Sequence, residues 1–262
     1  MNQPPRKGFV IVASKKIAFY YSALNLIESI RDYYPEAQFA LFTERKFMDH
    51  RCQDDPNIQL FECTDHVRSK LYGMANSPFD ITFYIDADCE IIHEDIANVW
   101  DQLNGNDMVF VELTKDNRAQ GSFVEVTAPI TSTGDMIDLI LCGGVCLYDM
   151  RNPVVRDFMQ EWWEKFQVQE DVYNEKDVGE NRRWFPKDTP RTMLRWDQFT
   201  LWWLTNKEDR YKELSIGRFE DNYRWNWFTS FRQNPTTGKY NLVDKDPVII
   251  HHSASMKKDA VY

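Results

Sequence analysis

Residues 81–92 have the sequence ITFYIDADCEII. Its first five residues predict a buried strand, which ends abruptly at Asp86 and Asp88 because carboxylates are costly inside a sheet. In open α/β sheets, ligands bind beyond the carboxyl ends of the strands. Two acids separated by one residue at such an end can share one divalent cation, and oxygen ligands suit Mg²⁺ or Mn²⁺. The simpler alternative is that both aspartates are ordinary turn residues.

The chain around this stretch alternates strands and helices. We predict strands at 8–13, 38–43, 58–63 and 107–112, and helices at 16–33, 66–76 and 94–103. A strand–helix–strand order favours parallel strands joined by right-handed crossovers. The first 112 residues therefore predict an α/β fold with an open, doubly wound sheet flanked by helices.

The second half of the chain is less regular. We predict a strand at 140–149, helices at 154–166 and 196–206, and a last strand at 248–250, with a charged loop at 169–191 and an aromatic, loop-like stretch at 216–231. A length of 262 residues fits a single domain, with a regular half at 1–112 and an irregular half at 113–262.

Composition excludes several classes of protein. The net charge of −10 argues against a basic face for nucleic acid. Five cysteines without a framework spacing indicate reduced thiols. No stretch approaches the roughly 18 apolar residues of a membrane span, and the N-terminal apolar run is too short for a signal peptide. We expect a cytoplasmic protein without a transmembrane segment.

The acid pair also carries a resemblance to a known family. The segment SPFDITFYIDADCEIIHEDIANVW at 77–100 resembles the metal-binding segment of GT-A fold glycosyltransferases. It is most similar to the family that includes glycogenin and the lipooligosaccharide galactosyltransferases. The resemblance implies a Rossmann-like, mostly parallel sheet, with a nucleotide-binding half at 1–112 and an acceptor-side half at 113–262.

The same resemblance implies an activity and its cofactors. Members of this family are Mn²⁺-dependent hexosyltransferases that use UDP-sugars, and most retain the anomeric configuration. For this chain we therefore expect a nucleotide-sugar donor, Mn²⁺ or Mg²⁺, and a glycan or other hydroxyl acceptor. Neither the sugar nor the stereochemistry follows from the sequence, and front-face retention is the interpretation that we favour.

Further segments match the family's donor-binding positions. The opening strand and helix resemble its nucleotide-binding start, so the backbone around Ala13 and Ser14 should approach the base, and that around Ala87 the donor. Lys70 lies sixteen residues before Asp86, an interval at which the family has a donor-contacting lysine. Its charge would act on the diphosphate or the sugar. An exposed helix lysine is the alternative.

A histidine near the end of the chain completes the expected metal site. By the resemblance, His251 is a third ligand beside Asp86 and Asp88, and Lys257, six residues later, binds phosphate and stabilises the departing UDP. A neutral imidazole is a suitable ligand beside two carboxylates. His252 is the rival ligand, because neighbours on a strand point to opposite faces.

Two short motifs resemble the family's sugar-binding residues. The sequence CGGV at 142–145 resembles an Asn-x-Gly-Val segment that contacts the donor sugar, and Gly143 and Gly144 would let the backbone approach a ligand closely. Many relatives have asparagine where this chain has Cys142, which leaves the sugar open.

The second of these motifs is Asp197-Gln198. By the resemblance, Asp197 binds sugar hydroxyls and Gln198 lies beneath the anomeric carbon. The alternative for Asp197 is a carboxylate that stabilises the positive end of a helix.

Two features have competing interpretations. The aromatic side chains between Phe219 and Phe231 would either form an acceptor platform or pack as a hydrophobic cluster. The charged segment 169–191 would either close over the donor or form a solvated loop.

Two other functions compete with sugar transfer. A metal-dependent nucleotidyltransferase or sugar-nucleotide pyrophosphorylase would use a similar acid pair. Such enzymes usually have a glycine-rich loop after the first strand, where this chain has Ser14-Lys15-Lys16. A non-catalytic carbohydrate-binding protein would suit the aromatic residues but would leave the acid pair, the histidine and the spaced lysine without a role.

Overall fold

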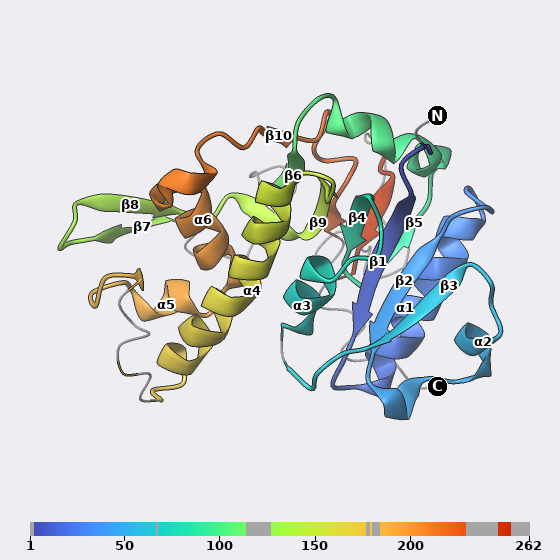
Figure 1. Ribbon diagram of the computed structural model, residues 1–262, viewed down its shortest axis with the longest axis horizontal. Coiled ribbons are helices and arrows are strands. Elements are labelled where there is room, and N and C mark those ends of the chain that lie inside the picture. Colours follow the sequence, from blue (N-terminus) through green and yellow to red (C-terminus); the bar gives the residue numbers. More distant parts are fainter. Residues whose placement is uncertain are drawn as a thin grey trace, which may run out of the picture.

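The computed structural model describes residues 3–66, 68–113, 127–176, 179, 184–228 and 246–252. Its centre is a seven-stranded sheet with the order β10-β6-β9-β4-β1-β2-β3 (Figure 1). The strands are β1 (Lys7–Ala13), β2 (Phe39–Thr43), β3 (Ile58–Glu62), β4 (Ile81–Ile85), β6 (Met108–Glu112), β9 (Leu141–Asp149) and β10 (Ile216–Arg218). β9 runs antiparallel to both its neighbours, β4 and β6, and the other pairs are parallel. The predicted α/β fold with a mostly parallel sheet is confirmed.

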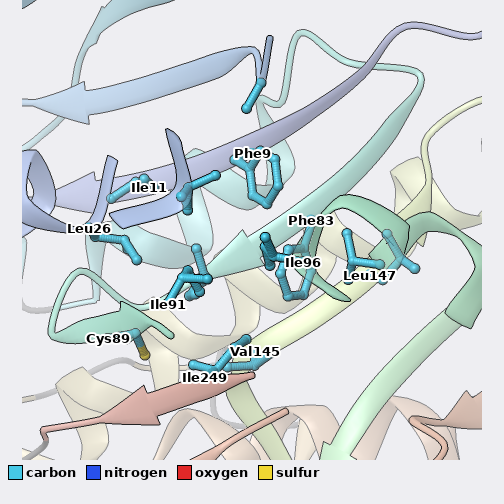
Figure 2. Close-up of a cluster of buried hydrophobic side chains, with 14 of the residues drawn as sticks. Phe9, Ile11, Leu26, Phe83, Cys89, Ile91, Ile96, Val145, Leu147 and Ile249 are labelled. Carbon is cyan, nitrogen blue, oxygen red and sulfur yellow. The ribbon is translucent and has the colours of Figure 1, made fainter. Parts of the chain in front are cut away.

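Helices cover both faces of this sheet. They are α1 (Ile17–Arg31), α2 (His50–Gln53), α3 (Ser69–Ala75), α4 (Pro153–Tyr173), α5 (Arg191–Leu194) and α6 (Asp197–Lys207), with the 3-10 helices η1 (Arg45–Phe47), η2 (Glu94–Leu103) and η4 (Asp209–Tyr211). Side chains alternate across a strand, so β1 serves two cores. Phe9 and Ile11 pack with α1 and η2, and Val10 and Val12 pack with α3 and α4. Figure 2 shows the first of these clusters.

A small second sheet brings the C-terminal part of the chain to the end of β4. It contains β5 (Cys89–Ile91), β11 (Trp227–Phe228) and β12 (Ile249–His251) in the order β11-β12-β5. β12 runs antiparallel to β5, with His251 opposite Cys89. Ile91 and Ile249 anchor this pairing in the first hydrophobic cluster (Figure 2). A residue far along the chain is thereby fixed beside the acid pair.

A hairpin that the sequence analysis did not predict projects from the main sheet. β7 (Thr127–Ile130) and β8 (Asp135–Asp138) form a separate two-stranded sheet beside α5 and α6 (Figure 1). Its inward residues Ile130 and Ile137 join a third cluster with aromatic side chains of α6. Asp188 accepts hydrogen bonds from Thr131 and Ser132, which ties the hairpin turn to the loop before α5.

Two predictions for the second half were wrong in part. α4 continues to Tyr173, where a loop was predicted from residue 169, because Gln169 is buried and its amide donates to the carbonyls of Leu194 and Trp196. The stretch 216–231 contains β10 and β11. Of the two interpretations of the aromatic residues there, packing in a hydrophobic cluster is confirmed for Phe219 and Trp225, which are buried in the first cluster.

All five cysteines are buried free thiols, as expected for reduced side chains. In the part of the chain that the structure describes, no helix combines the length and the apolar character that crossing a bilayer requires.

Candidate active site

The acid pair follows directly from the end of β4. The Asp86 amide donates to the Gly144 carbonyl at 2.8 Å, which continues the β4–β9 pairing by one residue. The Tyr84 hydroxyl donates to Asp86 Oδ1 at 2.6 Å and fixes the carboxylate. Asp88 lies in the tight turn between β4 and β5, where its carbonyl accepts from the His252 amide at 2.9 Å. Both carboxylates thus stand at the carboxyl end of a central strand.

His251, rather than His252, faces the acid pair. His251 Nε2 lies 3.2 Å from Asp88 Oδ1, whereas His252 Nε2 lies 2.8 Å from Glu90 Oε2. The two histidines diverge because they are neighbours in an extended segment. The possible ligand atoms of Asp88, Cys89 and His251 all lie within 4.8 Å of one another.

Asp86 approaches the same place from the other side. A Cβ on Gly144 would lie 2.5 Å from Asp86 Oδ2 and 3.4 Å from His251 Cε1. The Asp86 carboxylate and the His251 ring therefore flank one point above the Gly144 backbone, and a larger residue at 144 would displace the carboxylate. Glycine is needed there because side chains of the site itself approach the backbone.

The charges at this point fit a divalent cation. Burial raises the pKa of Asp86, against the pull of the Lys70 ammonium. Burial opposes the charged forms of Asp88 and His251 too, but their mutual attraction outweighs it, so the pKa of Asp88 is lowered and that of His251 is raised. A carboxylate oxygen and an imidazole nitrogen 3.2 Å apart need a proton or a metal ion between them, since both otherwise present lone pairs. A proton can fill this place, and the donor set of two carboxylates and one imidazole also suits Mn²⁺ or Mg²⁺.

Lys70 connects the acid pair with the start of α6. Its ammonium lies 3.1 Å from Asp197 Oδ2 and 3.7 Å from Asp86 Oδ1, and it donates to the Gly143 carbonyl at 3.2 Å. Arg68 Nε lies 3.5 Å from the other carboxylate oxygen of this residue, Asp197 Oδ1. Burial lowers the pKa of Lys70, but the two carboxylates outweigh it and raise the pKa above its ordinary value. The ammonium is therefore a fixed positive charge beside the proposed metal ligands, not an exposed helix lysine.

Comparison with solved structures identifies the fold that holds these residues. The glycosyltransferase GlyE of Streptococcus pneumoniae TIGR4 matches 95% of this chain with a TM-score of 0.56 and 12% sequence identity, and this chain spans 56% of GlyE. The galactosyltransferase LgtC, in complex with donor and acceptor sugar analogs, matches 95% with a TM-score of 0.50 and 12% identity, over 87% of its own length. This chain has the GT-A glycosyltransferase fold.

One further solved structure matches the same fold, and two other comparisons found no match. The bifunctional glycosyltransferase WbbM matches 97% of the chain with a TM-score of 0.51 and 12% identity, and this chain spans 47% of WbbM. The chain thus covers about half the length of GlyE and of WbbM. No protein-family model and no curated protein matches the sequence.

Within the GT-A fold, Asp197 and Gly143 fit closely together. A Cβ on Gly143 would lie 2.9 Å from Asp197 Oδ2 and 3.1 Å from the Trp162 ring. The Trp162 indole in turn donates to the Asp197 carbonyl at 3.0 Å. Burial raises the pKa of Asp197, but Lys70 and Arg68 outweigh it, and the pKa lies below its ordinary value. Asp197 is thus a buried, ionised carboxylate held against β9.

Gln198 borders a cavity beside α6. Its Oε1 is buried, and none of the described groups hydrogen-bonds it. The cavity has a volume of about 390 Å³. Its walls are one face of α6, the chain between β8 and β9, and the segment from η4 to β10; Trp202, Thr205, Asn206, Tyr211 and Arg218 are among its lining residues.

The remaining predicted site residues have different positions. Ala13 is buried at the end of β1, and the Ser14 hydroxyl donates to the His66 carbonyl before α3 at 3.3 Å. Ala87 is buried between the two aspartates. Lys257 lies outside the described residues.

Sequence reasoning missed three residues of the site: Tyr84, Arg68 and Asn226. Tyr84 has the even spacing from Asp86 that places both on one face of the strand, a signal that could have been used. Arg68 and Asn226 give no such signal, because only the folded chain brings them to Asp197 and His251.

Proposed function

We propose that this protein is a divalent-metal-dependent glycosyltransferase that moves a sugar from a nucleotide-diphosphate donor, most simply a UDP-sugar, to a hydroxyl acceptor. One observation carries the proposal: at the carboxyl end of β4, His251 faces Asp88 and also lies near Asp86 across Gly144, next to the largely buried ammonium of Lys70. The GT-A fold supports it, since LgtC has that fold and was solved with donor and acceptor sugar analogs.

Each side chain has a role in this proposal. Asp86, Asp88 and His251 hold Mn²⁺ or Mg²⁺, which when bound neutralises charge on the diphosphate leaving group. Lys70, already fixed between Asp86 and Asp197, donates to the diphosphate or to a sugar hydroxyl. Fixed charges around a leaving group stabilise the transition state without a cost of reorganisation.

The sugar-binding roles fall to the start of α6. Asp197 accepts hydrogen bonds from sugar hydroxyls, and Gln198 presents its buried oxygen, which no described group hydrogen-bonds, beneath the anomeric carbon. An amide is a weak nucleophile, so we propose front-face transfer with retention. Lys257 would add a second cation at the departing phosphate, and the backbone at Ala13, Ser14, Ala87, Gly143 and Gly144 would contact the donor.

Donor turnover in the absence of acceptor tests this function. Purified protein with Mn²⁺ and a panel of nucleotide sugars should slowly release the nucleoside diphosphate from one of them, and chelation by EDTA should stop the release. The product is measured by coupled assay or chromatography. Release of pyrophosphate from a sugar phosphate and a nucleoside triphosphate would instead indicate a nucleotidyltransferase. If the protein neither binds nor turns over any nucleotide sugar, the result would instead indicate a non-catalytic carbohydrate-binding protein.

The cavity beside Gln198 is the proposed place for the acceptor. Its volume of about 390 Å³ lies in the range of small-molecule sites, and its α6 wall offers a hydroxyl, two amides and an indole ring. We expect Thr205→Trp, which fills the cavity, to slow transfer to a panel of methyl glycosides by at least about tenfold. Donor hydrolysis should stay within about twofold of the wild type.

Thr205→Ser is the matched control, because it keeps the hydroxyl and does not fill the cavity. Transfer by Thr205→Ser should equal that of the wild type. Equal losses of transfer and hydrolysis in Thr205→Trp would show that the donor site is disturbed and that the cavity is not a separate acceptor site.

A further inference from the structure

We infer that Asn226 positions His251 for metal binding and that the Cys142 thiol in turn holds Asn226. This inference rests on the proposed metal site and adds two residues to it that do not touch the donor, the acceptor or the ion. Asn226 lies in the turn before β11 and is completely buried. A buried amide with specific partners has a definite orientation, since each of its groups needs a suitable partner.

Two hydrogen bonds fix Asn226. Its Oδ1 lies 2.9 Å from His251 Nδ1, and its Nδ2 donates to Cys142 Sγ at 3.3 Å. The Gly144 amide also donates to this sulfur, at 3.4 Å. The thiol thus accepts from two N–H groups, which come from Asn226 and from the backbone under the Asp86 carboxylate.

The direction of these bonds selects a histidine tautomer. Asn226 turns its NH₂ group to the Cys142 sulfur and its oxygen to His251. An amide oxygen can only accept, so it pairs with a protonated Nδ1. The lone pair of Nε2 is then directed to the side of Asp88, where the ion is proposed to bind. Hydrogen bonds to the distal nitrogen of a ligating histidine commonly fix its tautomer and orientation in this way.

This arrangement gives Cys142 a role other than donor binding. Cys142 is buried and its sulfur is engaged by Asn226 and Gly144. Cys142, which stands where the resembling family has asparagine, therefore acts on the histidine ligand indirectly, through Asn226.

Two substitutions of Asn226 with opposite expected effects test the inference. Asn226→Leu keeps the branched shape of the side chain but removes the acceptor, and should weaken the binding of Mn²⁺ alone by about 10- to 100-fold. Asn226→Asp keeps an acceptor for Nδ1–H and should bind Mn²⁺ at least as tightly as the wild type. Binding is measured from the electron paramagnetic resonance signal of free Mn²⁺, with no donor and no turnover, and circular dichroism checks that both variants are folded.

A second pair of variants applies if Asn226→Leu does not fold. Cys142→Ser keeps an acceptor and should bind Mn²⁺ within about threefold of the wild type, whereas Cys142→Val has no acceptor and should bind it several-fold more weakly. Wild-type affinity in Asn226→Leu or Cys142→Val, or equal losses in Asn226→Leu and Asn226→Asp, would overturn the inference. A wild type that binds Mn²⁺ but turns over no nucleotide sugar would refute the proposed function and leave this inference standing.

Discussion

Asp88→Asn should lower Mn²⁺-dependent turnover by about 1,000-fold or more, equivalent to about 4 kcal/mol of transition-state stabilisation, while the chain still folds. The substitution removes the carboxylate that faces His251 Nε2 at 3.2 Å and leaves the ion with one acidic ligand. Folding should persist because an amide fills the same space and the Asp88 carbonyl keeps its bond from the His252 amide. Steady-state release of the nucleoside diphosphate at saturating Mn²⁺ measures the effect.

Glu90→Gln is the matched control for this prediction. Glu90 lies two residues from Asp88, also pairs with a histidine, and faces away from the acid pair. Its substitution should leave turnover and Mn²⁺ affinity within about twofold of the wild type. Undiminished turnover in Asp88→Asn would show that Asp88 is not a metal ligand. Equal losses of turnover in both variants would point to a general loss of structure.

The parts of the fold that could be predicted are those with local causes. A five-residue apolar strand that ends in Asp86 and Asp88 determines its own burial and its end, because ionised side chains leave the sheet interior. The alternation of strands and helices up to Glu112 likewise fixed the α/β class and the parallel strands. These inferences needed only periodicity and the cost of burying charge.

Features that depend on contacts distant in sequence could not be predicted by the same reasoning. The pairing of β12 with β5 decides that His251 faces Asp88, and its register is set by packing of Ile249 in the core. The end of α4 depends on Gln169, whose polar side chain suggested a loop until its partners at the end of α5 were known. For the two glycines after Cys142, the sequence predicted a close backbone approach but not that Asp86 and Asp197 are the groups that approach.

The second large effect should come from the buried pair of Lys70 and Asp197. Asp197→Asn removes the charge 3.1 Å from the Lys70 ammonium and 3.5 Å from Arg68. Asp197 is buried and Lys70 is largely buried, and removing one partner of such a pair costs about 3–5 kcal/mol. We expect the free energy of unfolding in urea to fall by about 3 kcal/mol. Turnover should fall by at least about 100-fold, since the sugar loses its proposed carboxylate partner.

A double variant separates the two consequences. Lys70→Met in the Asp197→Asn background removes the ammonium that has lost its nearer carboxylate, so part of the lost stability should return. Turnover should stay as low as in Asp197→Asn or fall further. Asp135→Asn is the surface control: its partner Lys207 is partly exposed, and such pairs contribute less than about 1 kcal/mol. If the two losses of stability simply add in the double variant, the pair is not coupled. Full recovery of turnover in the double variant would show that Lys70 and Asp197 serve only the fold. Their proposed roles at the donor require that stability returns in the double variant and turnover does not.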